Sequence, residues 1–125
     1  MSEELHYLSA TEALARFRAR ELSPVELLKA MIERADAVEP TINAFAETRY
    51  EAALEEAREA EARYAGKGES PRPLEGLPVA VKEEAPIAGQ KNTLGSIPLA
   101  DVVADSGRVP SVYLAILPSH SIITR

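Results

Sequence analysis

A loop rich in glycine and proline, residues 66–73, divides the chain into two parts with different hydrophobic patterns. Before the loop, apolar residues recur every three or four positions, which is typical of helices. After it, residues 74–82 contain a short apolar run bounded by glycine and proline, which is typical of a buried strand. Helices followed by such a strand predict an α/β fold.

The part before the loop carries three helix signals. Ser9 and Glu12 form a capping box at the start of the first helix. Ser23 and Pro24 begin the second helix, which we expect to end before Pro40 because proline breaks a helix interior. A short strand is expected over residues 42–48. The third helix is expected over residues 50–65, with one buried stripe formed by Tyr50, Ala53, Leu54, Ala57, Ala60 and Tyr64.

Composition limits the classes of function. The 125 residues suffice for one domain or a piece of one, and 14 Lys and Arg against 20 Asp and Glu give a net charge of -6. Basic residues are not concentrated anywhere, so we expect no nucleic-acid partner. The absence of cysteine excludes disulfides and thiolate chemistry and is compatible with a reducing compartment. Neither a secretory signal nor a stretch of membrane-spanning length is present, so the sequence predicts a soluble, cytoplasmic protein.

Lys82 is the candidate catalytic residue. Because side chains alternate along a strand, Lys82 is expected where the buried strand emerges, on the face opposite Val79 and Val81. An arbitrary lysine in this position usually covers apolar surface with its stem and holds its ammonium in solvent. Glu83 and Glu84 follow it directly, and two nearby carboxylates favour the charged form of a lysine.

The neighbourhood of Lys82 resembles the segment that carries the catalytic lysine of the amidase signature family. The residues concerned are Pro73-Leu74-Glu75-Gly76-Leu77-Pro78-Val79-Ala80-Val81-Lys82. Further segments are similar to the family in the same order, namely residues 22–27, 42–45, 88–96, 100–101 and 104–106. Several ordered motifs identify a family better than one does. The resemblance covers about residues 8–106, which we interpret as the N-terminal part of an amidase domain.

The resemblance implies a hydrolase of carboxylic amide C–N bonds that uses a Ser–cis-Ser–Lys triad on a mixed sheet covered by helices. Lys82 would accept a proton through a bridging serine, without any cofactor, and the substrate of the complete enzyme would be a small-molecule amide. The serine-bearing Gly-Gly-Ser-Ser-Gly-Gly-Ser-like segment of the family does not occur in these 125 residues. We therefore expect the chain alone to be inactive. Within the family, a general amidase is favoured over the transamidating component of glutamyl-tRNA amidotransferase.

Residues 107–125 depart from the family pattern and are interpreted as a divergent or truncated tail. Pro110 can start a helix, which Pro118 should stop after about two turns. Our hypothesis is a frameshift or truncation near Gly107, which would leave apolar edges exposed and favour self-association.

Other functional interpretations are weaker. Ser119-His120-Ser121 places an imidazole beside hydroxyls, but adjacent residues of an extended chain point to opposite faces. His6 and His120 are too isolated in the sequence to predict a metal centre. The alternative to an amidase is a noncatalytic helical interaction module that uses the stripe of residues 50–65, or a degenerate fragment.

Overall fold

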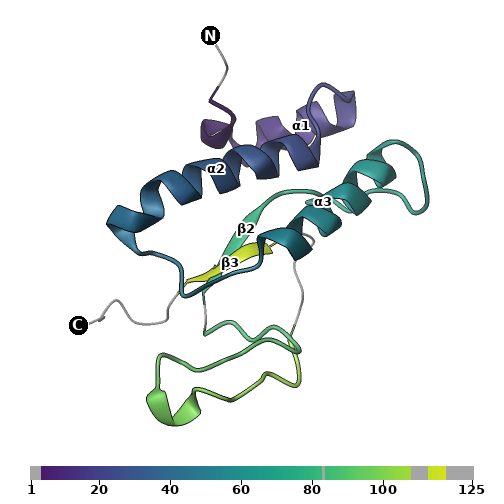
Figure 1. Ribbon diagram of the computed structural model, residues 1–125. Helices are drawn as coiled ribbons and strands as arrows, with labels where there is room; N and C mark the ends of the chain where they lie inside the picture. Colours follow the sequence, from purple (N-terminus) through teal and green to yellow (C-terminus); the bar gives the residue numbers. More distant parts are fainter. Residues whose placement is uncertain (1–3, 83, 108–112, 118–125) are drawn as a thin grey trace.

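In the computed structural model, the α-helices gather on one side of the molecule and the strands lie beneath them (Figure 1). The structure describes residues 4–82, 84–107 and 113–117, the last of these as backbone only. The elements in chain order are η1 (Leu5–Tyr7), α1 (Ala10–Ala19), α2 (Pro24–Ile42), β1 (Glu47–Thr48), α3 (Tyr50–Tyr64), β2 (Val79–Lys82), η2 (Ile97–Leu99) and β3 (Tyr113–Leu117). The predicted α/β class is confirmed.

Serine side chains cap the first two helices, as the sequence predicts. The Glu12 N–H donates to Ser9 Oγ at 3.2 Å in front of α1. The Val25 N–H donates to Ser23 Oγ at 3.0 Å, and Pro24 is the first residue of α2. Each hydroxyl satisfies a backbone donor that has no partner within its helix. The starts of α1 and α2 are therefore determined locally.

The end of α2 differs from the prediction, because the helix continues through Pro40 to Ile42. Asn43 then takes the left-handed conformation with φ 46° and donates its N–H to the Glu39 carbonyl at 2.8 Å. The Glu39 carboxylate accepts from the N–H groups of Ala44 and Phe45 at 2.9 and 3.1 Å. A proline this close to the end removes little helical hydrogen bonding, and the Glu39 contacts close the last turn.

The strand expected over residues 42–48 is much shorter in the structure. Ile42 belongs to α2, and Glu47 and Thr48 alone form β1. The backbone between them is held by the Glu39 carboxylate and the left-handed Asn43, so it is not available for a ladder. Side-chain capping thus replaced strand pairing over most of this segment.

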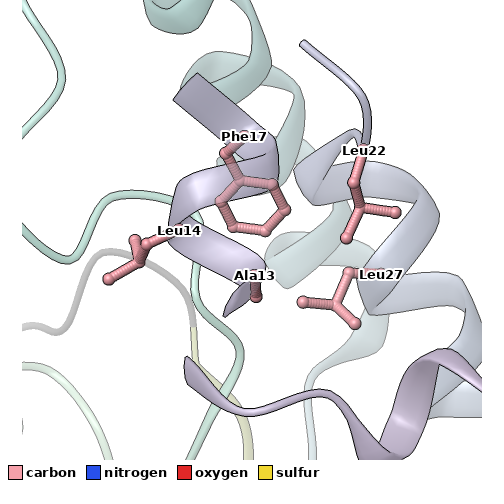
Figure 2. Close-up of a cluster of buried hydrophobic side chains, with 5 residues drawn as sticks. All are labelled: Ala13, Leu14, Phe17, Leu22 and Leu27. Atoms are coloured by element: carbon pink, nitrogen blue, oxygen red, sulfur yellow. The ribbon is translucent and has the colours of Figure 1, made fainter. Parts of the chain in front are cut away.

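The core lies between the helices. One cluster joins α1 to the start of α2 and is drawn in Figure 2; its buried members are Ala13, Leu14, Phe17, Leu22 and Leu27. The Phe17 ring is fully buried and contacts the Tyr64 ring of α3 at a centroid distance of 5.7 Å. Burying a side chain of this size stabilises a fold by about 1.5–3 kcal/mol. Most of the hydrophobic stabilisation therefore comes from helix packing.

The buried stripe predicted for the third helix is confirmed. Ala53, Ala57 and Ala60 are fully buried, and Tyr50, Leu54 and Tyr64 are partly buried. Ala53 and Ala57 form a second cluster with Leu28 of α2. Small side chains let two helices approach closely, so the stripe is used inside the molecule.

The strands form a mixed three-stranded sheet in the order β1-β3-β2. β3 pairs antiparallel with β1 and parallel with β2, with Thr48 opposite Ala115 and Lys82 opposite Leu117. Residues 113–117 therefore form a strand and not the helix that Pro110 could have started. Their sequence, Tyr-Leu-Ala-Ile-Leu, suits a strand, and the central position provides hydrogen bonds along both edges. The domain boundary at residue 106 stays a prediction, and Pro118 and residues 119–121 lie outside the described residues.

Residues 85–107 form an excursion that leaves the sheet, away from the helices (Figure 1, bottom). Its two arms are joined by backbone hydrogen bonds, from the Gly89 N–H to the Ala104 carbonyl at 2.8 Å and from the Asn92 N–H to the Val102 carbonyl at 2.9 Å. η2 forms its tip. Within the described residues, no helix is both long and apolar enough to cross a bilayer.

Candidate active site around Lys82

Lys82 is the last residue of β2, as the strand pattern predicts. Its Nζ lies 3.1 Å from Oε1 of Glu84, and the two side chains are 51% and 57% exposed. Of the two glutamates that follow Lys82, Glu84 therefore contacts the ammonium, whereas Glu83 lies outside the described residues. An exposed pair of this kind contributes little to stability.

The strand that carries Lys82 is not buried, contrary to the prediction. Val79 is 39% exposed, Ala80 is exposed and Val81 is partly buried. β2 is one of the two outer strands of the sheet formed by the described residues, and it pairs with β3 along one edge. An apolar run is buried only where another layer covers it, and in the described structure the helices pack mainly on one another and on β3. The pattern of residues 77–82 indicated a strand correctly but not its environment here.

A buried carboxylate anchors the chain just before β2. The Glu75 side chain is 3% exposed and accepts hydrogen bonds from Arg72 Nε and Nη2 at 2.7 and 3.0 Å. It also accepts from Arg63 Nη1 of α3 at 3.2 Å and from the Arg72 N–H at 3.3 Å. A buried carboxylate needs this number of donors to offset the loss of water. The cluster ties the loop of residues 66–73 and the start of β2 to α3.

The ionisation of this cluster follows from its geometry. The hydrogen bonds from Arg72 hold the pKa of Glu75 below its ordinary value, although burial by itself would raise it. The charge of Arg63 also lowers this pKa. The same hydrogen bonds raise the pKa of the Arg72 guanidinium. Glu75 is therefore stabilised as a carboxylate, which makes it a structural charge and not a proton donor.

Two backbone contacts complete the anchor. The Tyr64 hydroxyl donates to the Glu75 carbonyl at 2.9 Å, and burial raises the pKa of this hydroxyl. Gly76 has φ +82° and lies so close to α2 that an added Cβ would stand 2.8 Å from Cγ of Pro24. Only glycine combines this conformation with this approach. The start of β2 is thus fixed against both α2 and α3.

Sequence reasoning did not single out this anchor. Its signal was present, because Glu75 interrupts an apolar run and follows Arg72 at a spacing of three residues. Arg63 follows Glu59 by four residues, a spacing that favours an ion pair within the helix, whereas in the structure Arg63 contacts Glu75 and Glu69. That contact depends on how the loop folds back on α3.

The segments after Lys82 that resemble family motifs lie in the excursion. Residues 88–96 and 100–106 form its two arms, which are bridged at Lys91 and Val103. Lys91 Nζ lies 4.0 Å from Oδ1 of Asp101, and both side chains are exposed. The structure thus places the motifs next to one another but gives no side-chain contact between this pair and Lys82.

The two histidines are the remaining candidates. His6 lies in η1, where its ring stacks at an angle on Tyr7 with centroids 4.4 Å apart. His120 lies outside the described residues. Over residues 4–82 and 84–107, no cluster of His, Asp and Glu has the size of a metal site.

Comparison with known proteins gives a consistent result. The sequence model of the family described as Amidase matches residues 26–113. A glutamyl-tRNA(Gln) amidotransferase component of Carboxydothermus hydrogenoformans is 44% identical over 93 residues, which are 74% of this chain and 19% of that protein. An acylamidase of Rhodococcus erythropolis is 39% identical over 107 residues, which are 86% of this chain and 22% of that protein.

A solved structure shows the same fold. The chain superposes on a bacterial aryl acylamidase of the amidase signature family with a TM-score of 0.79 and 26% identity. The match covers 93% of this chain and 26% of the acylamidase chain. The chain thus spans about a fifth of the length of the curated relatives described above.

Proposed function

This chain belongs to the amidase family, and we propose that it supplies the lysine, Lys82, of a Ser–cis-Ser–Lys triad in an amide-hydrolysing enzyme. The family consists of hydrolases that act on amides. The observation that supports the role of Lys82 is its position at the end of β2, the strand that follows the anchored Glu75-Gly76 turn, within the matched residues 26–113. Both serines would come from the part of the amidase domain that lies outside the 125 residues.

The proposed chemistry uses Lys82 as a proton acceptor. Its neutral amine would take a proton from the bridging serine, which takes one from the nucleophilic serine as that oxygen attacks the amide carbonyl carbon. In the described structure Glu84 lies against the ammonium. For proton acceptance this carboxylate would have to turn away, and because the Glu84 side chain is 57% exposed, a rotation meets little resistance. Removal of water from Lys82 by the rest of the domain would favour the neutral amine.

The proposed substrate is a small-molecule carboxylic amide. The relatives include both an acylamidase and an amidotransferase component, and the similarity to the acylamidase extends over more of this chain. A general amidase therefore stays our proposal. The cytoplasmic location and the inactivity of the isolated chain also stay predictions.

The helical interaction module is less well supported. Its stripe of Ala53, Ala57 and Ala60 is fully buried against the other elements of this chain. A surface that is already covered cannot bind a partner helix without unfolding its own core. The stripe therefore belongs to the fold.

A segment-exchange experiment tests the proposal. In the Rhodococcus erythropolis acylamidase, the residues aligned with this chain are replaced by the corresponding residues of this chain, and hydrolysis of an acylamide is measured. We expect the chimera to hydrolyse the acylamide. Its Lys82→Ala variant should have a kcat lower by a factor of about 10²–10⁴, because the substitution removes a proton-transfer group. Lys91→Ala is the matched control, because Lys91 is also exposed and ion-paired.

Two outcomes would contradict the proposal. One is a Lys82→Ala chimera that hydrolyses the amide as fast as the unmodified chimera. The other is Lys82-dependent turnover by the isolated 125-residue chain on a panel of amides, which would refute the proposed dependence on serines from outside.

A further inference from the structure

Two short segments of the chain are rich in arginine although the chain as a whole is acidic. Residues 16–20 and residues 63–72 together contain six of the 14 basic residues and a single acidic residue, Glu69. The net charge of the whole chain is -6. More than forty positions separate the two segments in the sequence, so the sequence alone shows no concentration of positive charge.

The fold brings the two segments together. Arg18 Nη2 donates to the Pro73 carbonyl at 3.3 Å, and Arg20 Nη1 donates to the Tyr64 carbonyl at 3.2 Å. The first contact joins the end of α1 to the loop that follows α3, and the second joins it to the last residue of α3. The arginines of both segments therefore share one end of the molecule (Figure 1).

An open pocket of about 450 Å³ lies at this end of the molecule. The side chains of Arg18, Arg63 and Tyr64 line it, together with loop residues between positions 66 and 71. The loop leaves the space open, since a Cβ added at Gly66 or Gly68 would meet no atom within 4 Å. The pocket is large enough for a small molecule.

Arg18 brings a positive charge to the pocket that no carboxylate offsets. In the described part of the chain, the guanidinium of Arg18 donates to the neutral Pro73 carbonyl and forms no ion pair. A guanidinium has five N–H donors, so most of those on Arg18 are available to a ligand. Burial raises the pKa of the Tyr64 hydroxyl, and the charge of Arg18 acts on this pKa in the opposite direction. The charge of Arg18 is therefore felt at the pocket wall.

Arg63 is the second cation of the pocket, and its neighbourhood is only partly neutralised. It shares the buried Glu75 carboxylate with Arg72. Its other carboxylate neighbour is Glu69, which lies 4.0 Å away and has a side chain that is 87% exposed. An exposed ion pair at this distance is weak. Glu69 is therefore held loosely enough for another anion to replace it.

We propose that this pocket binds a small oxyanion, a phosphate or a carboxylate, between the guanidinium groups of Arg18 and Arg63. Arginine pairs with both kinds of anion through parallel N–H···O hydrogen bonds, which fix the orientation as well as the position of the ligand. Among the described residues, the N–H groups of Gly68 and Ser70 donate to no other group, so they can add hydrogen bonds from the loop. The proposal goes beyond the proposed function and does not involve Lys82.

A titration of the full 125-residue chain tests the proposal. Inorganic phosphate and succinate are added separately at constant ionic strength, with sodium chloride as the reference, and backbone amide resonances are followed by NMR. We expect saturable shifts centred on residues 66–71 with phosphate, with succinate or with both, and none with chloride. The anion that binds more tightly identifies the class of ligand.

Three variants separate a built site from general charge attraction. Arg18→Gln should weaken binding at least about tenfold, because it removes a charged partner of the anion. Arg58→Gln is the matched control, since Arg58 is an exposed arginine of α3 that pairs with Glu55 outside the pocket, and it should leave the affinity unchanged. Glu69→Gln should strengthen binding several-fold, because it removes the competing carboxylate. Such a gain cannot result from a loss of structure.

The opposite results would overturn the proposal. Shifts that rise without saturation, or that spread over all basic residues, would show screening of charge and not a site. Equal affinity losses in Arg18→Gln and Arg58→Gln would lead to the same conclusion, as would an unchanged affinity in Glu69→Gln. A Lys82→Ala chain should bind the anion normally, so the outcome is independent of the test of the proposed function.

Discussion

The helical half (residues 4–65) and the lysine-bearing half (residues 74–107) are stabilised in different ways. Of the eleven buried hydrophobic residues in the described structure, ten lie in the helical half, and Ile87 is the exception. Of the eight large hydrophobic residues that are exposed there, six lie in the lysine-bearing half. The helical half therefore closes its own core, whereas the lysine-bearing half depends on the Glu75-Gly76 anchor and on backbone pairing.

This difference indicates that the two halves have different roles: the helical half provides stability, and the lysine-bearing half presents Lys82. Helix packing fixes a platform, the anchor attaches the start of β2 to that platform, and the residues beyond it present Lys82 and an apolar surface. Substitutions should consequently destabilise the isolated chain most in the helical core, less at the anchor and least at Lys82.

The largest effect is expected in the core of the helical half. Phe17→Ala should reduce the free energy of unfolding by about 3–5 kcal/mol, because it removes a fully buried ring and leaves a cavity. Ile97→Ala, at a side chain that is 90% exposed, should change it by less than about 0.5 kcal/mol. Urea unfolding of both variants measures the difference. Similar losses of unfolding free energy in the two variants would show that the two halves share one core, which would contradict the difference described above.

The next effect is expected at the anchor. Gly76→Ala should cost about 1–3 kcal/mol more than Gly66→Ala, because an added Cβ at Gly76 meets the Pro24 ring at 2.8 Å and one at Gly66 meets nothing within 4 Å. Both glycines have positive φ, at +82° and +77°, so the backbone strain is matched. Chemical unfolding gives the two values, and equal values would mean that Gly76 does not press on α2.

Removing the charge of Glu75 should have a somewhat smaller effect. Glu75→Gln keeps the shape but weakens hydrogen bonds to two guanidinium groups, and we expect a loss of about 1–3 kcal/mol in unfolding free energy. Glu69→Gln is the control, since the Glu69 side chain is 87% exposed and 4.0 Å from Arg63. If both variants melt alike, the anchor does not stabilise β2.

The same carboxylate predicts a dependence on pH. The pKa of Glu75 is lower in the folded chain than its ordinary value of 4.5, so its stabilising contribution is present above that value. It is lost as the pH falls through the lower native pKa. Unfolding measured at neutral and acidic pH should therefore show a smaller acid-induced loss for Glu75→Gln than for the unmodified chain. An identical acid response of the two proteins would contradict the assignment.

The smallest effect on stability is expected at Lys82 itself. Lys82→Met removes an exposed ion pair with Glu84 and should change the unfolding free energy by less than about 0.5 kcal/mol. The same change in the chimera should abolish turnover, which separates a functional from a structural lysine. A loss of more than about 1 kcal/mol in the isolated chain would contradict the open environment described for Lys82.

Much of the fold was predictable because its signals are local. The caps at Ser9 and Ser23 and the alanine stripe of α3 depend on residues within a few positions of one another. Pro40 misled the prediction for α2, because the carboxylate of Glu39 and the left-handed Asn43 close the helix after the proline. Competing side-chain contacts of this kind are not visible in hydrophobic periodicity.

The environment of the site was less predictable. The apolar run ending at Lys82 indicated a strand and, by resemblance, a catalytic lysine. Whether that strand is buried depends on the layer that covers it, and the described elements leave Val79 and Ala80 exposed. The Arg63–Glu75 contact was likewise hidden, because it joins α3 to a residue beyond the loop and depends on the tertiary fold.

Hydrogen exchange resolved by residue tests the central claim most directly, namely that the helical half closes its own core and the lysine-bearing half contributes little to it. In the isolated chain, amides of α1, α2 and α3 should exchange slowly and those of residues 85–107 rapidly. Equal protection of both halves in the isolated chain would contradict the account.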